Sequence, residues 1–278
     1  MKLWEVLKQL VITSRPVGWI VFSGIFVSSL NYAGVQFGAD KIIHLLLLTF
    51  PAGIICNGLN DVADYPYDLK NPRKKSGWSG NVLDKKYHKI VIWLAIIFSG
   101  LLLIPPLYYQ NWLMFWATVT TIFISYSYSF KPFRFKSVLG VEILSNLVGT
   151  LALILIGFSY GGNLLDFINK ASTNLIAFCG VIIAIAFQAF ISDYEVDKAS
   201  GDHNLIHFLG KKLSSVSASL IYLVCFFTTT YPSLKIGFVL CFVLCLLPLF
   251  FFKAKFFTLF YYSNVIILTI SFLSIVIF

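Results

Sequence analysis

A first acidic segment carries residue types from which a site for a hard metal ion can be built. Residues 57–77 read NGLNDVADYPYDLKNPRKKSG and contain Asn60, Asp64 and Asp68 at intervals of four. On an α-helix this spacing forms one stripe, because each step of four residues advances about 40° and rises about 6 Å. Pro66 removes one helical hydrogen bond and biases the residue before it away from the helical conformation. We therefore expect the helix to end near Asp64 and a turn to carry Asp68.

A second acidic segment repeats the pattern more than a hundred residues later. Residues 192–204 read SDYEVDKASGDHN, with Asp193 and Asp197 four apart and Asp202 beyond them. Crowded carboxylates repel one another, and a cation relieves that repulsion. All-oxygen ligands favour Mg²⁺ or Mn²⁺, and protein-bound Mg²⁺ usually completes its shell with water and phosphate. The two segments together predict two or more Mg²⁺ ions holding a diphosphate, with Mn²⁺ as a substitute.

These segments and their surroundings supply a set of candidate site residues. The candidate catalytic residues are Asn60, Asp64, Asp68, Asp193 and Asp197, and the same five with Asp61 are the candidate metal ligands. Arginine and lysine bind phosphate oxygens, and the candidates for the diphosphate are Arg15, Lys70, Arg73, Arg134, Lys136 and Lys198. Aromatic rings stabilise a carbocation through cation–π attraction. The aromatic candidates nearest the acidic segments are Tyr126, Tyr128 and Tyr194.

Simpler interpretations stand beside these assignments. Charged loop residues are usually just solvated, and this is the alternative for Asp61, Asp84, Glu142 and Glu195. His203 and His207 are four apart and could indicate zinc, but no third ligand is evident from the sequence. The five cysteines lie in or beside apolar segments without a CxxC pair, which favours packing over disulfides or a metal.

The composition identifies the elements that must position these residues. Apolar residues make up 58% of the 278-residue chain and charged residues only 12%, with a mean hydropathy of +0.84, whereas soluble domains carry about 25% charged residues. Runs of about 20 apolar residues span a bilayer as helices. We predict an all-α polytopic membrane protein, with 1–278 as one domain and 1–16 as an interfacial amphipathic helix. The nine predicted spans are 17–37, 41–59, 89–109, 112–130, 138–160, 173–192, 214–232, 234–252 and 256–278.

Charge distribution predicts the orientation of these spans. The net charge is +9, and of 21 Lys and Arg residues all but Lys41, Lys170 and Lys235 fall on the face that holds the N-terminus. The positive-inside rule makes that face cytoplasmic and puts the C-terminus opposite. Because the charge is sorted by loop, it indicates membrane lipid and not nucleic acid as the partner. The acids lie at span ends and not at the midplane, which disfavours the remote alternative of a divalent-cation transporter.

The motifs together resemble the UbiA-type intramembrane prenyltransferases. NDVADYPYD is similar to the first signature of that family, NDxxDxxxD, and SDYEVDKASGD is similar to the second, DxxxD followed by a Gly-containing loop. The segment YSYSFKPFRFKS is similar to the family's tyrosine-rich YSxPPxRxK, with Lys131 in place of the first proline. Arg15-Pro16 matches the Arg-Pro at the start of the first span.

This resemblance implies a fold and an activity. The family has nine helices around a central cavity and transfers a prenyl group from a Mg²⁺-bound prenyl diphosphate to a lipophilic acceptor through a carbocation. The loop DLKNPRKKSGWSGNVLDKKYH resembles lycopene elongases, whereas the second motif is closer to branches acting on glyceryl lipids or aromatic acids. The acceptor therefore stays open among aromatic, glyceryl lipid and carotenoid. An intramembrane terpene cyclase, which needs no acceptor, is the alternative enzyme.

Overall fold

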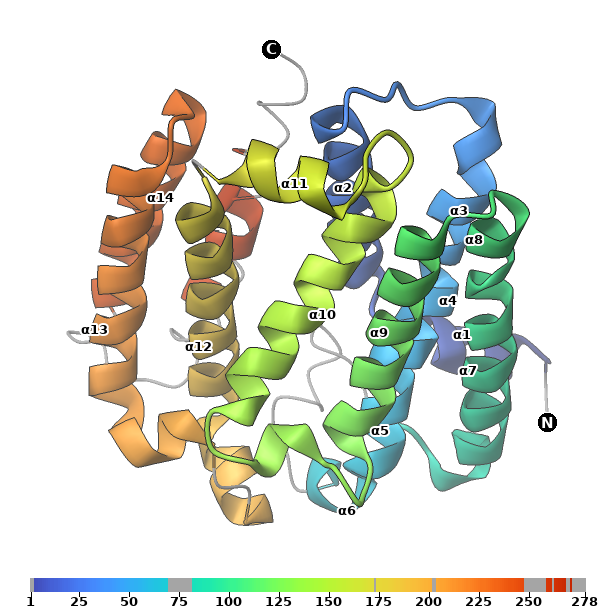
Figure 1. The fold of residues 1–278 in the computed structure, drawn as a ribbon. Coiled ribbons are helices and arrows are strands. Elements are labelled where there is room, and N and C mark those ends of the chain that lie inside the picture. The colour runs from blue at the N-terminus through green and yellow to red at the C-terminus, as the bar shows by residue number, and fades with distance from the viewer. Residues whose placement is uncertain are drawn as a thin grey trace. The chain divides into compact units, whose positions relative to one another are not determined.

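The computed structural model describes residues 3–69, 82–172, 174–201, 204–247, 259–261, 263–268 and 271. Over these residues the chain is helical, with short turns between helices and no strand (Figure 1). The predicted all-α class is confirmed. Lys70, Arg73, Asp202 and His203, all named in the sequence analysis, lie outside the described residues.

The α-helices follow one another with few long connections. In the first half they are α1 (Leu3–Thr13), α2 (Pro16–Tyr32), α3 (Ile42–Leu47), α4 (Phe50–Gly53), α5 (Leu59–Ala63), α6 (Tyr65–Asp68), α7 (His88–Leu102), α8 (Ile104–Tyr108) and α9 (Trp112–Ser129). In the second half they are α10 (Val141–Phe158), α11 (Leu164–Ala171), α12 (Leu175–Ser200), α13 (Leu205–Thr228) and α14 (Pro232–Leu246). A π-helical segment, η2 (Ile54–Gly58), joins α4 to α5, and 3₁₀ turns occupy Ala39–Lys41, Lys85–Tyr87 and Phe135–Ser137.

Several of these helices are long and apolar enough to cross a membrane. Among the described residues five qualify, namely Ala39–Ala63, Lys85–Tyr108, Val141–Phe158, Leu175–Glu195 and Leu205–Thr228, and the bent pair α1 and α2 makes a sixth. Helix α9 covers the predicted span 112–130, but six Ser and Thr residues lower its hydropathy. The predicted count of nine spans remains a prediction.

The chain divides into two compact units. Unit 1 comprises Met1–Phe135 and Leu151–Asn163, and unit 2 comprises Lys136–Thr150 and Leu164–Phe278. Helix α10 therefore contributes its first part to unit 2 and its second part to unit 1. The expectation that 1–278 forms a single domain stays a prediction.

Unit 1 packs the first acidic segment against three helices. The continuous stretch α4–η2–α5 packs against α2, α7 and α9 (Figure 1). Phe26, Ile54, Val91 and Met114, one from each part of this packing, are fully buried. Gly53 permits the close approach of the α1–α2 turn, because a Cβ there would collide with the backbone oxygen of Ser14. This contact holds the turn that carries Arg15 against the acidic segment.

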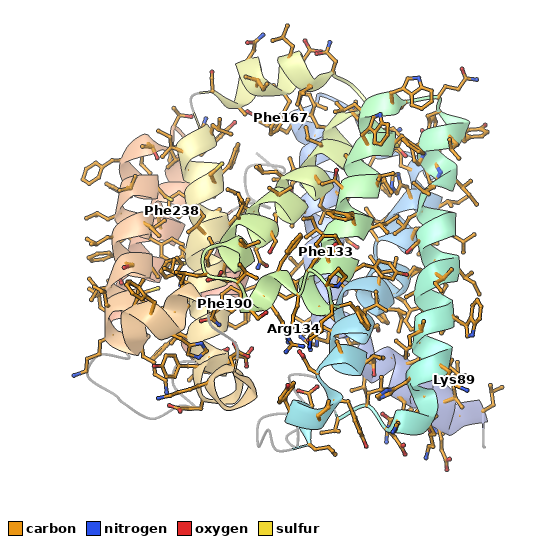
Figure 2. All side chains as sticks on the ribbon, turned by 60° about the horizontal axis from the view of Figure 1, so that its bottom comes forward. Lys89, Phe133, Arg134, Phe167, Phe190 and Phe238 are labelled. Carbon is orange, nitrogen blue, oxygen red and sulfur yellow. The ribbon has the colours of Figure 1, made fainter. Side chains whose placement is uncertain are left out.

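Unit 2 is built on α12, α13 and α14, which lie side by side (Figure 1). Phe190 of α12 and Phe238 of α14 are both buried in it (Figure 2). Three buried polar side chains are hydrogen-bonded in series in the same core. Asn264 donates to Gln188 at 2.9 Å, and Gln188 donates to the Tyr222 hydroxyl at 3.2 Å. Polar pairs inside an apolar core fix which helix faces meet.

Helix α1 has the pattern expected of a helix at a membrane surface. Its apolar side chains Leu3, Trp4, Leu7 and Val11 are exposed. The axes of α1 and α2 differ by 53°, with the bend at Arg15 and Pro16. Proline at the first helical position starts α2, because its missing N–H would have no helical partner there. An interfacial position for residues 1–16 stays a prediction that this bend favours.

Candidate functional site

The first acidic segment keeps its stripe across a break in the helix. Helix α5 ends before Asp64, and the separate turn α6, with Pro66 near its start, carries Asp68. The break predicted from Pro66 is therefore observed. The amide of Asp64 still donates to the Asn60 carbonyl at 2.9 Å, and the amide of Asp68 donates to the Asp64 carbonyl at the same distance. These i to i+4 bonds keep the three side chains in register along one side.

The π-helical segment η2 directly before the motif was not expected from the sequence. A π turn inserts one extra residue into a helix and rotates everything after it, and such turns are frequent at functional sites. Here the insertion ends at Gly58, two residues before Asn60. The direction in which the acidic stripe points is therefore set by η2 as well as by the spacing of the motif.

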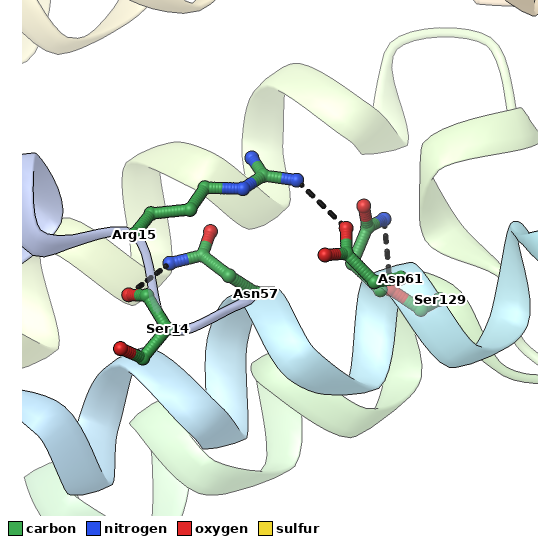
Figure 3. A network of polar contacts seen from close by, with 6 residues as sticks. Ser14, Arg15, Asn57, Asp61 and Ser129 are labelled. Atoms are coloured by element: carbon green, nitrogen blue, oxygen red, sulfur yellow. Dashed lines mark hydrogen bonds and ion pairs between the residues drawn. The ribbon is translucent and has the colours of Figure 1, made fainter. Parts of the chain in front are cut away.

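Arg15 and Asp61 form a partly buried ion pair at the first acidic segment. Their side chains meet at 2.9 Å between Nη2 and Oδ1 (Figure 3). The Asp61 side chain is fully buried and that of Arg15 is 31% exposed. Solvation, the alternative for Asp61, is therefore wrong, because its carboxylate faces a guanidinium and not water.

Two amide side chains of the same helical stretch anchor it to its neighbours (Figure 3). Asn57 donates to the backbone oxygen of Ser14 at 3.3 Å, and Asn60 donates to the Ser129 hydroxyl at 3.3 Å. The first bond reaches the α1–α2 turn and the second reaches the end of α9. Sequence reasoning missed Asn57, although it lies four residues before Asp61, the spacing that marks the rest of the motif.

Arg134 pairs with the next carboxylate along the segment. Its Nη2 lies 3.6 Å from Oδ1 of Asp64, and its guanidinium lies 5.7 Å from the ring centroid of Tyr67. Both side chains of the pair are more than four-fifths buried. Arg134, assigned from the sequence to the diphosphate, therefore lies against the first acidic segment.

The two arginines share an unusual backbone conformation. Arg15 has φ 52° and Arg134 has φ 38°, and Gln110 is the only other described non-glycine residue with positive φ. Non-glycine residues reach this region at a cost, and they concentrate at functional sites. The surrounding structure thus holds both guanidinium groups at the acidic segment against the local preference of the backbone.

The two carboxylates of the predicted second stripe lie in one unbroken helix. Asp193 and Asp197 both belong to α12, which Gly201 ends with φ 75°. The predicted stripe of two carboxylates therefore stands on a regular helix. Asn204 donates to Oδ2 of Asp197 at 3.4 Å. Next to Asp193, the Tyr194 ring packs on the His207 ring with centroids 4.7 Å apart.

The remaining candidates differ in their surroundings. Lys136 is buried, whereas Lys198 is exposed. Tyr126 is partly buried and packs against the core of unit 1, and Tyr128 is also partly buried. Nε2 of His207 lies 2.9 Å from the backbone carbonyl oxygen of Tyr194, so one of its two ring nitrogens makes a hydrogen bond within the protein.

From the sequence alone, four acidic residues are open to a simple interpretation as solvated loop residues. Two of the four do lie in solvent. Asp84 is exposed and pairs with Lys86 at 3.0 Å, and that hydrogen bond lowers the pKa of the Asp84 carboxyl. Glu195 is 68% exposed and pairs with Lys211. Glu142 is different, because it is fully buried and accepts a hydrogen bond from the backbone amide of Leu205. Solvation is therefore wrong for Glu142.

The donor types suit a hard cation, but two of the carboxylates, Asp61 and Asp64, pair with arginine. Among the described residues no three His, Cys, Asp or Glu side chains converge as a metal site would require. Asn60, Asp64 and Asp68 supply amide and carboxylate oxygens in one row, which is the chemistry that Mg²⁺ prefers. A metal ion at this row would therefore compete with Arg134 for Asp64.

The comparisons with known proteins agree with the motifs. The sequence model of the UbiA prenyltransferase family matches residues 18–276. The chain is 28% identical to a lycopene elongase/hydratase from Corynebacterium glutamicum over 57% of this chain and 55% of that protein. It is 26% identical to a lycopene elongase/hydratase from Halobacterium salinarum over 73% of this chain and 72% of that protein. The match thus spans only about half the length of the Corynebacterium relative.

A solved structure has the same fold. It is a UbiA homologue from Archaeoglobus fulgidus bound to DMAPP and Mg²⁺, with a TM-score of 0.63 and 19% identity over 96% of this chain and 99% of that chain. At that identity the likeness concerns the fold alone. Fold, sequence match and acidic motifs thus point to the same family.

Proposed function

Because this chain belongs to the UbiA prenyltransferase family, we propose that it transfers a prenyl group from a prenyl diphosphate to a lipophilic acceptor in a Mg²⁺-dependent reaction. The protein is an integral multi-pass membrane protein. A long isoprenoid chain gains about 0.8 kcal/mol per buried CH₂, so both substrates partition into the same membrane. The acidic segments would face the cytoplasm, from which Mg²⁺ and the diphosphate headgroup can reach them.

The observation that carries this proposal is the pairing of the first acidic segment with two arginines. Arg15 contacts Asp61 at 2.9 Å and Arg134 contacts Asp64 at 3.6 Å. The same place therefore holds ligands for a cation and guanidinium groups for an anion. A magnesium diphosphate contains both partners. Its binding would exchange the Arg134–Asp64 pair for two external pairs, from the carboxylate to the metal and from the guanidinium to a phosphate oxygen.

Each residue then has a role in the transfer. Asn60, Asp64 and Asp68, together with Asp193 and Asp197, would hold Mg²⁺, and Asp61 would keep Arg15 oriented. When bound, the metal neutralises charge that develops on the diphosphate as it leaves. Arg15 and Arg134 would stabilise the same charge.

The bond changes follow from that arrangement. The allylic C–O bond breaks with its electron pair going to the diphosphate oxygen, and a π bond of the acceptor attacks the resulting carbocation. A proton is then lost from the alkylated acceptor. Tyr126, Tyr128 and Tyr194 are the proposed ring neighbours of the carbocation.

For the acceptor, we propose a linear carotenoid. The support is that the curated relatives from Corynebacterium glutamicum and Halobacterium salinarum are both named lycopene elongase/hydratase. The loop after the first acidic segment resembles the same branch in its sequence. Glyceryl lipids and aromatic acids, which the second motif favours, are the competing acceptors.

The test is a reconstituted reaction with the full-length protein in lipid nanodiscs. We would supply Mg²⁺, prenyl diphosphates of two to four isoprene units, and either lycopene, a glyceryl phosphate lipid or an aromatic acid. Pyrophosphate release and mass spectrometry of the products report the reaction. We expect acceptor-dependent release that Asp64→Asn abolishes. Asp84→Asn is the matched control, because Asp84 lies in solvent near the same segment.

The outcomes separate the candidate functions. Product only with lycopene supports a carotenoid acceptor, and product only with another acceptor moves the protein to that branch. Release with hydrocarbon formed in the absence of any acceptor would identify a terpene cyclase. No Mg²⁺-dependent release from any diphosphate would overturn the proposal.

A further inference from the structure

Glu142 is a buried carboxylate to which the proposed chemistry gives no role. It lies in the first turn of α10, and its side chain is fully buried. Removing a carboxylate from water is costly unless charge or hydrogen bonds compensate it. A fully buried glutamate therefore requires specific partners.

One partner of Glu142 is a backbone amide at the start of another helix. Oε1 of Glu142 accepts from the backbone amide of Leu205 at 2.5 Å, and Leu205 is the first residue of α13. The first N–H groups of a helix lack helical acceptors, and the helix dipole favours negative charge there. Glu142 also lies in the first turn of its own helix. The Glu142 carboxylate therefore lies at the N-terminal end of α10 and accepts a hydrogen bond from the N-terminal end of α13.

The start of α13 is in turn attached to the second acidic segment. Asn204 caps α13, since its Oδ1 accepts from the His207 amide at 3.0 Å. Nδ2 of the same Asn204 side chain donates to Oδ2 of Asp197 at 3.4 Å. His207 reaches back to the Tyr194 carbonyl at 2.9 Å. The position of residues 204–207 therefore determines whether Asn204 can donate to Asp197.

This helical start is bounded by two breaks in the backbone. Gly201 and Gly210 both have φ 75°, and at Gly210 the conformation leaves the helical region within α13. A glycine in this backbone conformation interrupts the regular helix. Between these glycines, residues 204–207 make side-chain and backbone contacts that hold the start of α13, and Glu142 provides a contact from α10.

We infer that Glu142 is a positioning residue that fixes the start of α13 and, through Asn204, orients the carboxylate of Asp197 for metal binding. The inference rests on the proposed function, because it takes Asp197 to be a ligand of the Mg²⁺–diphosphate complex. Glu142 itself touches neither metal nor substrate in this scheme. It acts in the way that hydrogen-bond partners of metal ligands generally do, and losing such a partner typically weakens metal binding 10- to 100-fold.

Two pairs of variants isolate the hydrogen bond. Glu142→Leu removes the acceptor, whereas Glu142→Gln keeps a side-chain oxygen in place. Leu205→Pro removes the donor, whereas Leu205→Ala keeps it. Proline is well tolerated at the first position of a helix, and the preceding Asn204, with φ −90° and ψ 169°, already has the conformation that a following proline requires.

The measurement is binding of Mn²⁺, followed by electron paramagnetic resonance, to the full-length protein in nanodiscs with inorganic pyrophosphate. We expect Glu142→Leu and Leu205→Pro each to weaken metal binding at least about tenfold. Glu142→Gln and Leu205→Ala should stay within about threefold of the parent protein. The double variant Glu142→Leu with Leu205→Pro should bind as each single variant does, because both changes remove the same bond.

Each outcome decides the inference. Unchanged metal binding in Glu142→Leu and Leu205→Pro, with normal binding in the parent, would refute the positioning role and leave the proposed function intact. Additive losses in the double variant would also refute it, since the two changes would then act separately. Absence of pyrophosphate-dependent Mn²⁺ binding in the parent protein would overturn the proposed function and the inference together.

Discussion

Removing Arg15 should destabilise the protein by leaving a buried charge without its partner. Asp61 is fully buried, and the Arg15 guanidinium contacts it at 2.9 Å. Breaking a buried ion pair from one side costs about 3–5 kcal/mol. Because Arg15 is 31% exposed, water can partly replace it, and we take about 2–3 kcal/mol for Arg15→Ala. At about 2–4 °C per kcal/mol, the midpoint of thermal unfolding should fall by roughly 4–12 °C.

A double-mutant cycle shows whether the ion pair is the cause. Asp61→Asn removes the buried charge but keeps an oxygen that can accept from Arg15, so we expect a loss of only about 1 kcal/mol. Arg15→Ala with Asp61→Asn should then be more stable than Arg15→Ala alone, because the neutral amide no longer needs a cation. All four proteins would be heated in the same detergent at one scan rate, since unfolding of membrane proteins is rarely reversible.

Two results would contradict this reasoning. An unchanged midpoint in Arg15→Ala would mean that water or another cation satisfies Asp61 without cost. A double variant whose loss equals the sum of the single losses would mean that the two residues do not interact energetically. Adding Mg²⁺ and pyrophosphate separates binding from folding, because it should stabilise the parent protein more than Arg15→Ala if Arg15 also contacts the diphosphate.

Four further predictions concern the site. Asp64→Ala and Asp193→Ala should each lower turnover by at least about a hundredfold while the protein still inserts and folds, and near-normal steady-state rates in either variant would contradict a site built from both segments. Activity should vanish with EDTA and return with Mg²⁺, partly with Mn²⁺ and not with Zn²⁺, because the donors are oxygens; recovery with Zn²⁺ alone would argue against this ligand set. Arg134→Ala should lower kcat as well as raise KM, because charge grows on the leaving diphosphate, and an unchanged kcat would limit Arg134 to ground-state binding. Cysteines placed at residue 74, at residue 211 and at the C-terminus should label from the cytoplasm at the first two positions only, and labelling of residue 74 and the C-terminus from one side would exclude nine spans.

The sequence determined the class of fold and the chemistry of the donors. Composition alone specified membrane helices, because a chain with 12% charged residues and apolar runs of about 20 residues can satisfy its backbone in lipid only as helices. Spacing determined the acidic stripes, since the period of a helix is local. Pro66 predicted the break at Asp64 for the same reason, as its ring acts on its own turn.

Tertiary structure decided which charges meet, because partners far apart in the chain have no local signature. The spacing of residues could not show that Arg15 pairs with Asp61 across 46 positions, or that Arg134 pairs with Asp64 across 70. The positive φ values of both arginines are likewise imposed by packing against the local preference. In the sequence, Asp61 and Glu142 look like ordinary acidic residues of a loop or of a helix start. Only their burial in the structure distinguishes them from Asp84, which does lie in solvent.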